Sequence, residues 1–232
     1  MKPVIVLQNE PEAPAGYLGD ALDRGAVPWF VVRMYAGESP PEVDVISGAV
    51  SLGGAMGAYE EEKYPFLVDQ KRFLAECTAV GVPVLGICLG CQLLADALGG
   101  RAYLADEREV LLAPVEATSE GAGDPVIAAL AGRPVIRFHK DTFDVPPGTE
   151  VLATGGGFPQ AFRFGSALGI QPHPEVTPAL LSGWLAHGSG REAAIAAGTD
   201  PDALVAELTA AEEEVATTAA AVFDAWLDEL TP

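Results

Sequence analysis

Cysteine and histidine are both scarce in this chain of 232 residues, which contains three of each. The cysteines are Cys77, Cys88 and Cys91, an odd-numbered set without the spacing of a disulfide framework. So few thiols and imidazoles also leave little material for a closed zinc site. We therefore expect neither a disulfide scaffold nor a metal centre.

Basic residues and long apolar runs are also in short supply. Lysine and arginine number 13 against 33 aspartates and glutamates, which gives a net charge of −20 at pH 7. Such an acidic surface repels phosphate backbones and anionic lipids, so we expect neither nucleic acid nor membrane as a partner. No apolar run reaches the roughly 18 residues of a membrane span, and the start MKPVIVLQNEPEAP has too short an apolar stretch for a signal peptide. These absences predict a cytoplasmic protein whose acidity serves solubility.

The first hundred residues alternate short apolar runs with helical patterns. Runs of this kind are typical of strands buried on both faces of a parallel sheet. Strand followed by helix, repeated, predicts a doubly wound α/β fold. The predicted strands are 4–7, 29–34, 49–52 and 82–87, and the predicted helices between them are 15–24 and 65–80.

After Gly100 the pattern changes to short strand candidates separated by turn residues. We expect them to form an antiparallel extension of the sheet, interrupted by one short helix near 125–131. The candidates are 110–117, 134–138, 150–154, 161–164 and 167–171.

The last part of the chain is helical. Over 201–230 apolar residues recur every three or four positions after an Asp200-Pro201 cap signal, which predicts one long amphipathic helix. Its apolar stripe either covers the core, the interpretation we favour, or forms a surface for a homodimer or another partner. The chain is thus predicted to consist of one α/β domain over 1–190 and a helical extension, 191–232, packed on it.

The pattern of residues 86–90, Gly-Ile-Cys-Leu-Gly, is the thiol counterpart of a nucleophile elbow. The glycines permit a sharp turn from strand to helix, which holds Cys88 above the edge of the sheet. The helix N-terminus favours a thiolate, and the N–H of Leu89 is placed to donate to an oxyanion.

A nucleophilic cysteine needs a base and a group that orients the base. His173 and Glu175 follow a strand candidate, and residues two apart in an extended segment point the same way. Glu175 is thus placed to hold one imidazole nitrogen while the other faces Cys88. His187, beside a glycine, is interpreted instead as a helix-capping histidine.

Cys88 and Cys91 also have the spacing of a thioredoxin-like redox pair. A glycine of the elbow lies within that pair, and the His-Pro-Glu segment would then have no role. We therefore interpret Cys88 as a nucleophile rather than as half of a redox pair. Cys91 and Cys77 are interpreted as small residues packed in the core.

Residues 86–92 together with Pro172-His173-Pro174-Glu175 resemble the class I, triad-type glutamine amidotransferases. The similarity continues in order along the chain, and the His-x-Asp-Thr-Phe string at residues 139–143 is shared with free-standing, GMP-synthase-like glutaminase domains. The resemblance implies a flavodoxin-like, mostly parallel sheet with an antiparallel extension and a C-terminal helical appendage. Two positions depart from the family pattern: Pro172 replaces an aromatic residue, and Ala55 replaces a proline.

The resemblance also implies a role for each matching residue in the hydrolysis of L-glutamine to glutamate and ammonia. Cys88 would form a γ-glutamyl thioester, His173 would act as base and then acid, and Glu175 would orient His173. The oxyanion hole would use the backbone N–H groups of Gly54 and Leu89. The residues expected to contact the substrate are Gly53, Gln92, His139 and Asp141, with His139 and Asp141 equally well explained by bonds within a turn.

Three functions fit these residues. The first is a glutaminase that passes ammonia to a synthetase on a separate chain, since residues 1–190 are taken up by the glutaminase body. The second is a hydrolase acting on the γ-glutamyl bond of a small amine or peptide adduct. The third, a non-enzymatic regulatory subunit, leaves the intact triad unexplained. None of the three requires a metal or an organic cofactor.

Overall fold

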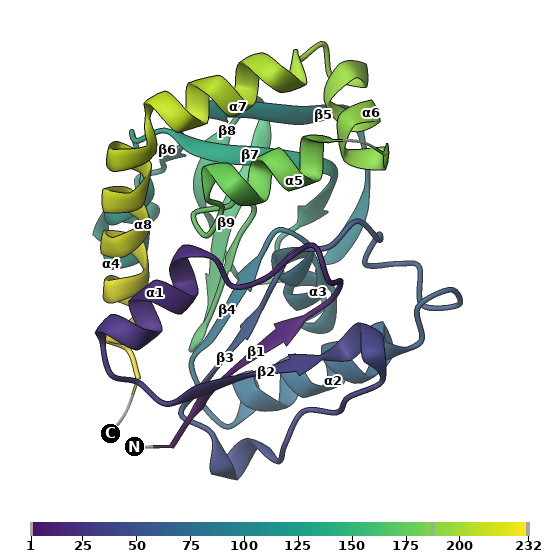
Figure 1. Ribbon diagram of the computed structural model, residues 1–232. Helices are drawn as coiled ribbons and strands as arrows, with labels where there is room; N and C mark the ends of the chain where they lie inside the picture. Colours follow the sequence, from purple (N-terminus) through teal and green to yellow (C-terminus); the bar gives the residue numbers. More distant parts are fainter. Residues whose placement is uncertain (1, 187, 231–232) are drawn as a thin grey trace.

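A computed structural model describes residues 2–186 and 188–230, so the interpretation of His187 lies outside the described residues. An eight-stranded mixed sheet forms its centre, in the order β2-β1-β3-β4-β10-β9-β8-β6 (Figure 1). The first five strands in this order are parallel, and the last three run antiparallel to their neighbours. Their bounds are β1 Val4–Gln8, β2 Trp29–Arg33, β3 Gly48–Ser51, β4 Val84–Ile87, β6 Glu116–Ala117, β8 Val151–Gly155, β9 Phe158–Phe164 and β10 Ala167–Ile170.

Helices cover both faces of this sheet, which confirms the doubly wound α/β class. In β1 the side chains of Val4 and Val6 enter one core, and those of Ile5 and Leu7 enter the core on the opposite face. Burial on both faces is the reason that the strand is a continuous apolar run rather than an alternating one. The first face is covered by α1 Tyr17–Arg24, α4 Pro125–Leu130 and α8 Glu212–Leu227, and the second by α2 Phe66–Ala79 and α3 Leu89–Ala97.

The expected antiparallel extension is only partly right. Strands β6, β8 and β9 extend the main sheet, but the segments predicted at 110–117 and 134–138 belong mostly to a separate two-stranded sheet. In that sheet β5 Arg101–Ala113 pairs with β7 Val135–Asp144, and both strands are longer than predicted. The pairing shifts register between Leu104 and Glu109. Periodicity detects a strand but does not identify its partner, which explains the error.

A second layer of helices packs on the β5–β7 sheet. The helices are α5 Pro178–Ala186, α6 Gly188–Ala196 and α7 Pro201–Ala210, in the upper part of Figure 1. Together with this sheet they enclose a third group of buried apolar side chains, the upper core. Its members are Val110, Ile136, Val176, Leu181, Leu185, Ala194, Leu204, Leu208 and Val215.

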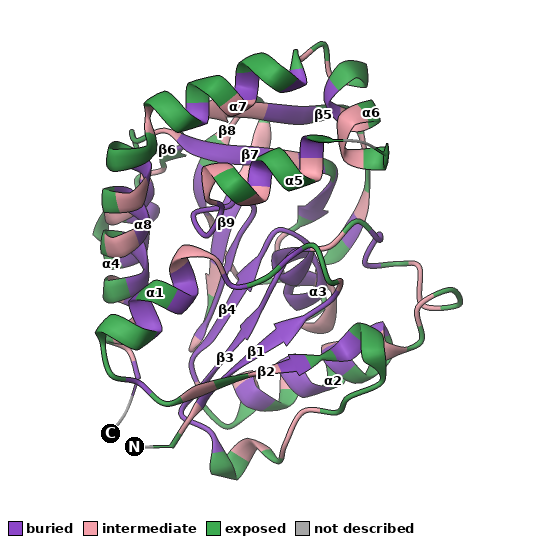
Figure 2. Ribbon diagram, in the orientation of Figure 1, coloured by how far each residue is buried: buried purple, intermediate pink, exposed green. Residues whose placement is uncertain are grey.

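The prediction of one helix over 201–230 is wrong, because the chain bends at Ala211 and forms two helices, α7 and α8. Asp200 caps α7 as expected, accepting hydrogen bonds from the N–H groups of Asp202 and Ala203. The apolar stripe is divided just after the bend: α7 and Val215, in the first turn of α8, face the upper core, whereas the later part of α8 is buried beside the main sheet (Figure 2). Three consecutive glutamates at 212–214 suit the positive end of a new helix dipole. These glutamates are the local sequence feature that indicates the boundary between α7 and α8.

The remaining regular segments are short 3₁₀ turns, Met34–Ala36, Val43–Val45 and Gly121–Gly123. Among the described helices, none combines the length and the apolar character that crossing a bilayer requires.

Candidate active site

Four neighbouring parallel strands end at the same edge of the main sheet. The residues that follow them are Asn9 after β1, Gly53 after β3, Cys88 after β4 and His173 after β10. The β5–β7 sheet lies next to this edge, because the N–H of His173 donates to the carbonyl of Ile136 in β7, at 2.8 Å. Ligands of open parallel sheets bind at such an edge.

Cys88 occupies a strained turn between β4 and α3. Its φ of 52° and ψ of −108° are rarely adopted by residues with a side chain. The turn is closed tightly around it: a Cβ on Gly90 would collide with the backbone of Ser51, and one on Gly86 would collide with Gly90. The glycines of the pattern are therefore required by space, and the thiol is held at the first turn of α3, 6% exposed.

His173 lies beside the thiol and is held by Glu175. Its Nδ1 is 2.7 Å from Oε1 of Glu175, and both side chains are buried. The thiol of Cys88 donates to the carbonyl of Phe138, at 3.8 Å. A Cβ on Gly53 would lie 3.1 Å from Cε1 of His173 and 3.7 Å from the Cβ of Cys88, so the two side chains meet next to Gly53. The structure thus brings together the three residues that the sequence analysis combined.

Burial and charge act in opposite directions on His173. Removal from water lowers its pKa, while the negative charges of Glu175 and of the Cys88 thiolate raise it. The charges prevail, so the pKa of His173 lies well above its usual value and the imidazolium form persists to higher pH.

The loop after β3 carries the predicted oxyanion donors. Within residues 2–186 and 188–230, no acceptor takes up the N–H of Gly54 or of Leu89. Asn9, fully buried after β1, holds this loop by donating from Nδ2 to the carbonyl of Leu52 at 2.8 Å. Gly54 fits between the side chains of Leu89 and Asn9, where a Cβ would be crowded. Asn9 was not among the residues predicted from the sequence, although a polar residue directly after a buried strand is a usable signal.

Replacing Asn9 with alanine is expected to lower the free energy of unfolding by about 1–3 kcal/mol, because the buried carbonyl of Leu52 loses its donor. Urea unfolding of the two proteins measures the difference. Thr78→Ala is the matched control, since it removes a side-chain hydrogen bond to a helix carbonyl in α2, away from this edge. A loss at Asn9 no larger than the loss at Thr78 would contradict the assignment.

Gln92, one helical turn after Cys88, is hydrogen-bonded to β7, the strand that contains the His-x-Asp-Thr-Phe string at residues 139–143. Its Nε2 donates to the carbonyl of Asp141 at 3.2 Å and to Oε1 of Gln171 at 3.1 Å. Burial raises the pKa of Asp141, an effect reduced by the hydrogen bond that its Oδ1 accepts from the hydroxyl of Tyr59 at 2.9 Å. Gln92 and Asp141 therefore form one side of the site.

His139 is held in a buried polar cluster that the sequence analysis did not detect. Its Nδ1 lies 3.1 Å from the carbonyl of Asp141, and its Nε2 lies 2.8 Å from Oε2 of Glu109. Glu109 also accepts a hydrogen bond from Gln160 and pairs with Arg137. Residues 139–141 lie within strand β7 rather than in a turn, so the bond from His139 to Asp141 is made inside a strand, and the segment also lines the cavity described below.

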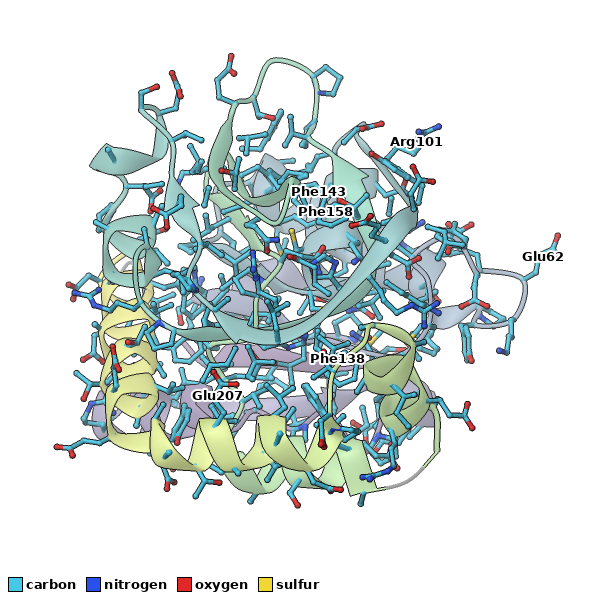
Figure 3. All side chains as sticks on the ribbon, turned by 90° about the horizontal axis from the view of Figure 1, so that it is seen from above. Glu62, Arg101, Phe138, Phe143, Phe158 and Glu207 are labelled. Carbon is cyan, nitrogen blue, oxygen red and sulfur yellow. The ribbon has the colours of Figure 1, made fainter. Side chains whose placement is uncertain are left out.

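A cavity of about 420 Å³ opens over these residues, with Gly53, Gly54, Cys88, Gln92, His139, Asp141 and His173 in its wall. Its opposite wall is formed by Phe138 and by residues of α5 and α6. In Figure 3, which views the molecule from above, Phe138 lies on the side of the β5–β7 sheet that faces α7, whereas Phe143 and Phe158 lie on the other side. The cavity thus lies between the main sheet and the upper layer of helices.

The other two cysteines are core residues, as interpreted from the sequence. Cys91 is completely buried, and a Cβ on Gly169 in β10 would lie 2.8 Å from its sulfur. Burial raises the pKa of Cys91 well above its usual value and that of Cys77 to about 12, so neither is a ready thiolate. Within the described part of the chain, no group of three or more potential ligands could hold a metal ion.

Known proteins similar to this chain share its sequence pattern and its fold. The family model described as "Glutamine amidotransferase class-I" matches residues 47–183. The glutamine amidotransferase-like protein YfeJ of Salmonella typhimurium is 32% identical over 219 residues, which are 90% of each chain. The glutamine-hydrolyzing GMP synthase of Thermomicrobium roseum is 39% identical over 132 residues, which are 56% of this chain and 23% of that enzyme.

Two solved structures agree with the model over nearly their whole length. The crystal structure of a glutamine amidotransferase from Thermotoga maritima has a TM-score of 0.87 and 27% identity, and the match covers 98% of both chains. That of a glutamine amidotransferase from Methylobacillus flagellatus has a TM-score of 0.89 and 25% identity over 100% of this chain and 96% of that one. Fold, sequence and the residues gathered at the strand ends lead to one conclusion: this chain belongs to the class-I glutamine amidotransferase family.

Proposed function

We propose that this protein hydrolyses the side-chain amide of L-glutamine to glutamate and ammonia through a γ-glutamyl thioester on Cys88. One observation supports this above all others. A cysteine in a strained strand-to-helix turn lies beside a buried imidazole that is bound to a carboxylate through Nδ1, and the thiol and the imidazole line one cavity. Nucleophile, base and orienting group are the minimum that acyl transfer by a thiol needs.

The proposed reaction begins with attack of the Cys88 sulfur on the amide carbon. The carbonyl oxygen becomes an oxyanion, which the N–H groups of Gly54 and Leu89 stabilise. His173 then gives its proton to the departing nitrogen, the carbon–nitrogen bond breaks and ammonia leaves. The γ-glutamyl group remains on sulfur as a thioester.

Water completes the reaction. His173, now neutral, takes a proton from a water molecule that attacks the thioester carbon, and the same N–H groups hold the second oxyanion. Collapse of this intermediate frees glutamate and restores the thiolate–imidazolium pair. Gln92, His139 and Asp141, with the backbone of Gly53, are proposed to hold the amino-acid part of the substrate.

Ammonia is proposed to pass to a synthetase on a separate chain. The support is the similarity to a glutamine-hydrolyzing GMP synthase, of which this chain matches only about a quarter. The matched part of that enzyme is its 132 residues of similarity to this chain, and a synthetase acting with this chain is proposed as the acceptor of ammonia.

Glutamate release from L-glutamine by the purified chain is the test. We expect release that depends on Cys88, together with a γ-glutamyl adduct on the peptide containing Cys88 after acid quenching and mass spectrometry. Release without any adduct, or an adduct on another residue, would contradict the proposed mechanism.

Replacing Glu175 with glutamine is expected to lower kcat/KM for glutamine about 10³- to 10⁴-fold, because His173 loses the carboxylate that orients it. The negative charge of Glu175 also raises the pKa of His173. Its removal lowers that pKa, so the alkaline limb of the pH profile moves to lower pH. The profile of glutamate release measures both effects.

Glu207→Gln provides the control for this variant, since Glu207 is exposed on the outer side of α7 (Figure 3). Its pH profile should match that of the unmodified protein. An alkaline limb that stays in place, or rises, in Glu175→Gln would show that Glu175 does not act on His173.

A further inference from the structure

The cavity is larger than one small amino acid needs. Its volume of about 420 Å³ falls in the range of pockets that enclose drug-sized ligands, about 300–1,000 Å³. When free glutamine is hydrolysed, the group that leaves beside His173 is ammonia. Ammonia fills almost none of the remaining space. The extra volume therefore needs a different explanation.

Part of the wall comes from a segment outside the family match. The family model ends at residue 183, whereas Trp184, Ser189, Gly190 and Ala193 line the cavity. This wall is thus contributed by the portion of the chain that the shared glutaminase pattern does not cover. Such a portion is where a difference in substrate would be built.

Trp184 fixes the position of this wall relative to the reacting groups. Its ring packs edge-on to His173, with 5.2 Å between ring centroids, and to Phe138 at 5.7 Å. Its Nε1 donates to the carbonyl of Glu12 at 2.7 Å, which ties α5 to the loop after β1. Because His173 gives the leaving group its proton, the leaving group departs beside Trp184. Trp184 is therefore part of the wall on the leaving-group side.

Charge indicates what this space would hold. Of the 13 lysines and arginines, nine form ion pairs with carboxylates. Among the described residues, the four cations without such a pair are Lys2, Arg108, Arg133 and Lys140. Arg108 and Lys140 both line the cavity.

Two unpaired cations in one cavity are notable in a chain with a net charge of −20. They suit a ligand that carries two carboxylates. The γ-glutamyl group supplies one of them, at its α-carbon, and the second would belong to the leaving group. Glu10 and Glu12, in the same wall, offer acceptors for the ammonium group.

We propose that the site hydrolyses γ-glutamyl dipeptides, in which the leaving group is an amino acid. This inference rests on the proposed thiol chemistry and specifies its substrate class. The γ-amide carbon–nitrogen bond breaks, Cys88 takes the γ-glutamyl group, and the amino acid leaves with the proton of His173. Water then releases glutamate. Trp184 and the α6 wall face the leaving amino acid, and Arg108 or Lys140 binds its carboxylate.

Three substrates with one acyl group test this. They are L-glutamine, γ-glutamylethylamide and γ-glutamylglycine, compared by the kcat/KM of glutamate release from the full chain, with Cys88→Ala as the blank. The ethylamide has a leaving group close in length to glycine but without its carboxylate. We expect γ-glutamylglycine to exceed both other substrates by at least about tenfold, the effect of one charged contact.

Variants locate the contact. In Arg108→Gln or in Lys140→Gln the preference for γ-glutamylglycine over the ethylamide should fall about 10- to 100-fold. The ratio of kcat/KM for the two substrates is informative because the loss of a cation that binds their shared α-carboxylate would lower both values equally. Arg133→Gln is the control, since Arg133 is exposed and bonds to helix carbonyls away from the cavity. Its ratio should be unchanged.

Each failure has its own signature. Cys88-dependent release from glutamine with none from γ-glutamylglycine would overturn this inference and leave the proposed glutaminase intact. Equal rates for γ-glutamylglycine and the ethylamide would overturn the carboxylate contact and with it the substrate class. Absence of Cys88-dependent release from all three substrates would overturn both proposals.

Discussion

Cys88→Ala is expected to abolish glutamate release, lowering kcat by at least about 10⁴-fold. No other thiol can replace it, because Cys77 and Cys91 are buried in the core and have raised pKa values. The same substitution should barely change the free energy of unfolding, since alanine keeps the side chain's first carbon in the same turn. Steady-state kinetics and urea unfolding on the same preparation separate the two effects.

Two further variants make this result decisive. Cys91→Ala should retain activity and lose about 1 kcal/mol of stability from its packing against Gly169. Cys88→Gly should be inactive but more stable than Cys88→Ala by about 1 kcal/mol, because glycine adopts a φ of 52° without strain. Activity that survives in Cys88→Ala and disappears in Cys91→Ala would reverse the assignment of the nucleophile.

Gly90→Ala is expected to have the largest effect on stability, a loss of about 3 kcal/mol or more. The added Cβ would meet the backbone of Ser51, which cannot move aside as a flexible side chain would. The first turn of α3 and the end of β3 would have to separate, and these two elements carry Cys88 and the Gly53-Gly54 loop. Activity should therefore fall further than the loss of folded protein explains.

Gly123→Ala is the matched control, because no atom lies within 4 Å of the Cβ that it would add. Its free energy of unfolding should stay within about 0.5 kcal/mol of the unmodified value. Similar losses in the two variants would show that the tight contact between α3 and β3 does not limit stability.

The elements that position the site were largely predictable. The parallel strands β1, β3, β4 and β10 are short apolar runs because both of their faces are buried, and that property is local to the sequence. The elbow was predictable for a similar reason: glycines at 86 and 90 are demanded by contacts within a few residues of the turn and with the neighbouring strand. His173 and Glu175 are two residues apart, so their contact also follows from local geometry.

Features that depend on distant partners were not predictable. The β5–β7 pairing joins segments about thirty residues apart, and apolar periodicity says nothing about which strand each one meets. The bend at Ala211 interrupts a stripe whose spacing continues unbroken, and the stripe passes from the upper core to the core beside the main sheet only after Val215. Asn9 and the cluster around Glu109 are polar residues whose partners come from other elements.

The bend at Ala211 has a consequence for how the molecule opens. The upper core and the core beside α8 are distinct, so the upper layer can open as its own cooperative unit while the main sheet stays closed. Amide hydrogens in α5 and α7 should then exchange with solvent faster than those in the later part of α8, with the change of rate falling after Val215, an upper-core residue in the first turn of α8. The first turn of α8 would then mark the boundary between a part of the chain that opens and a part that stays folded.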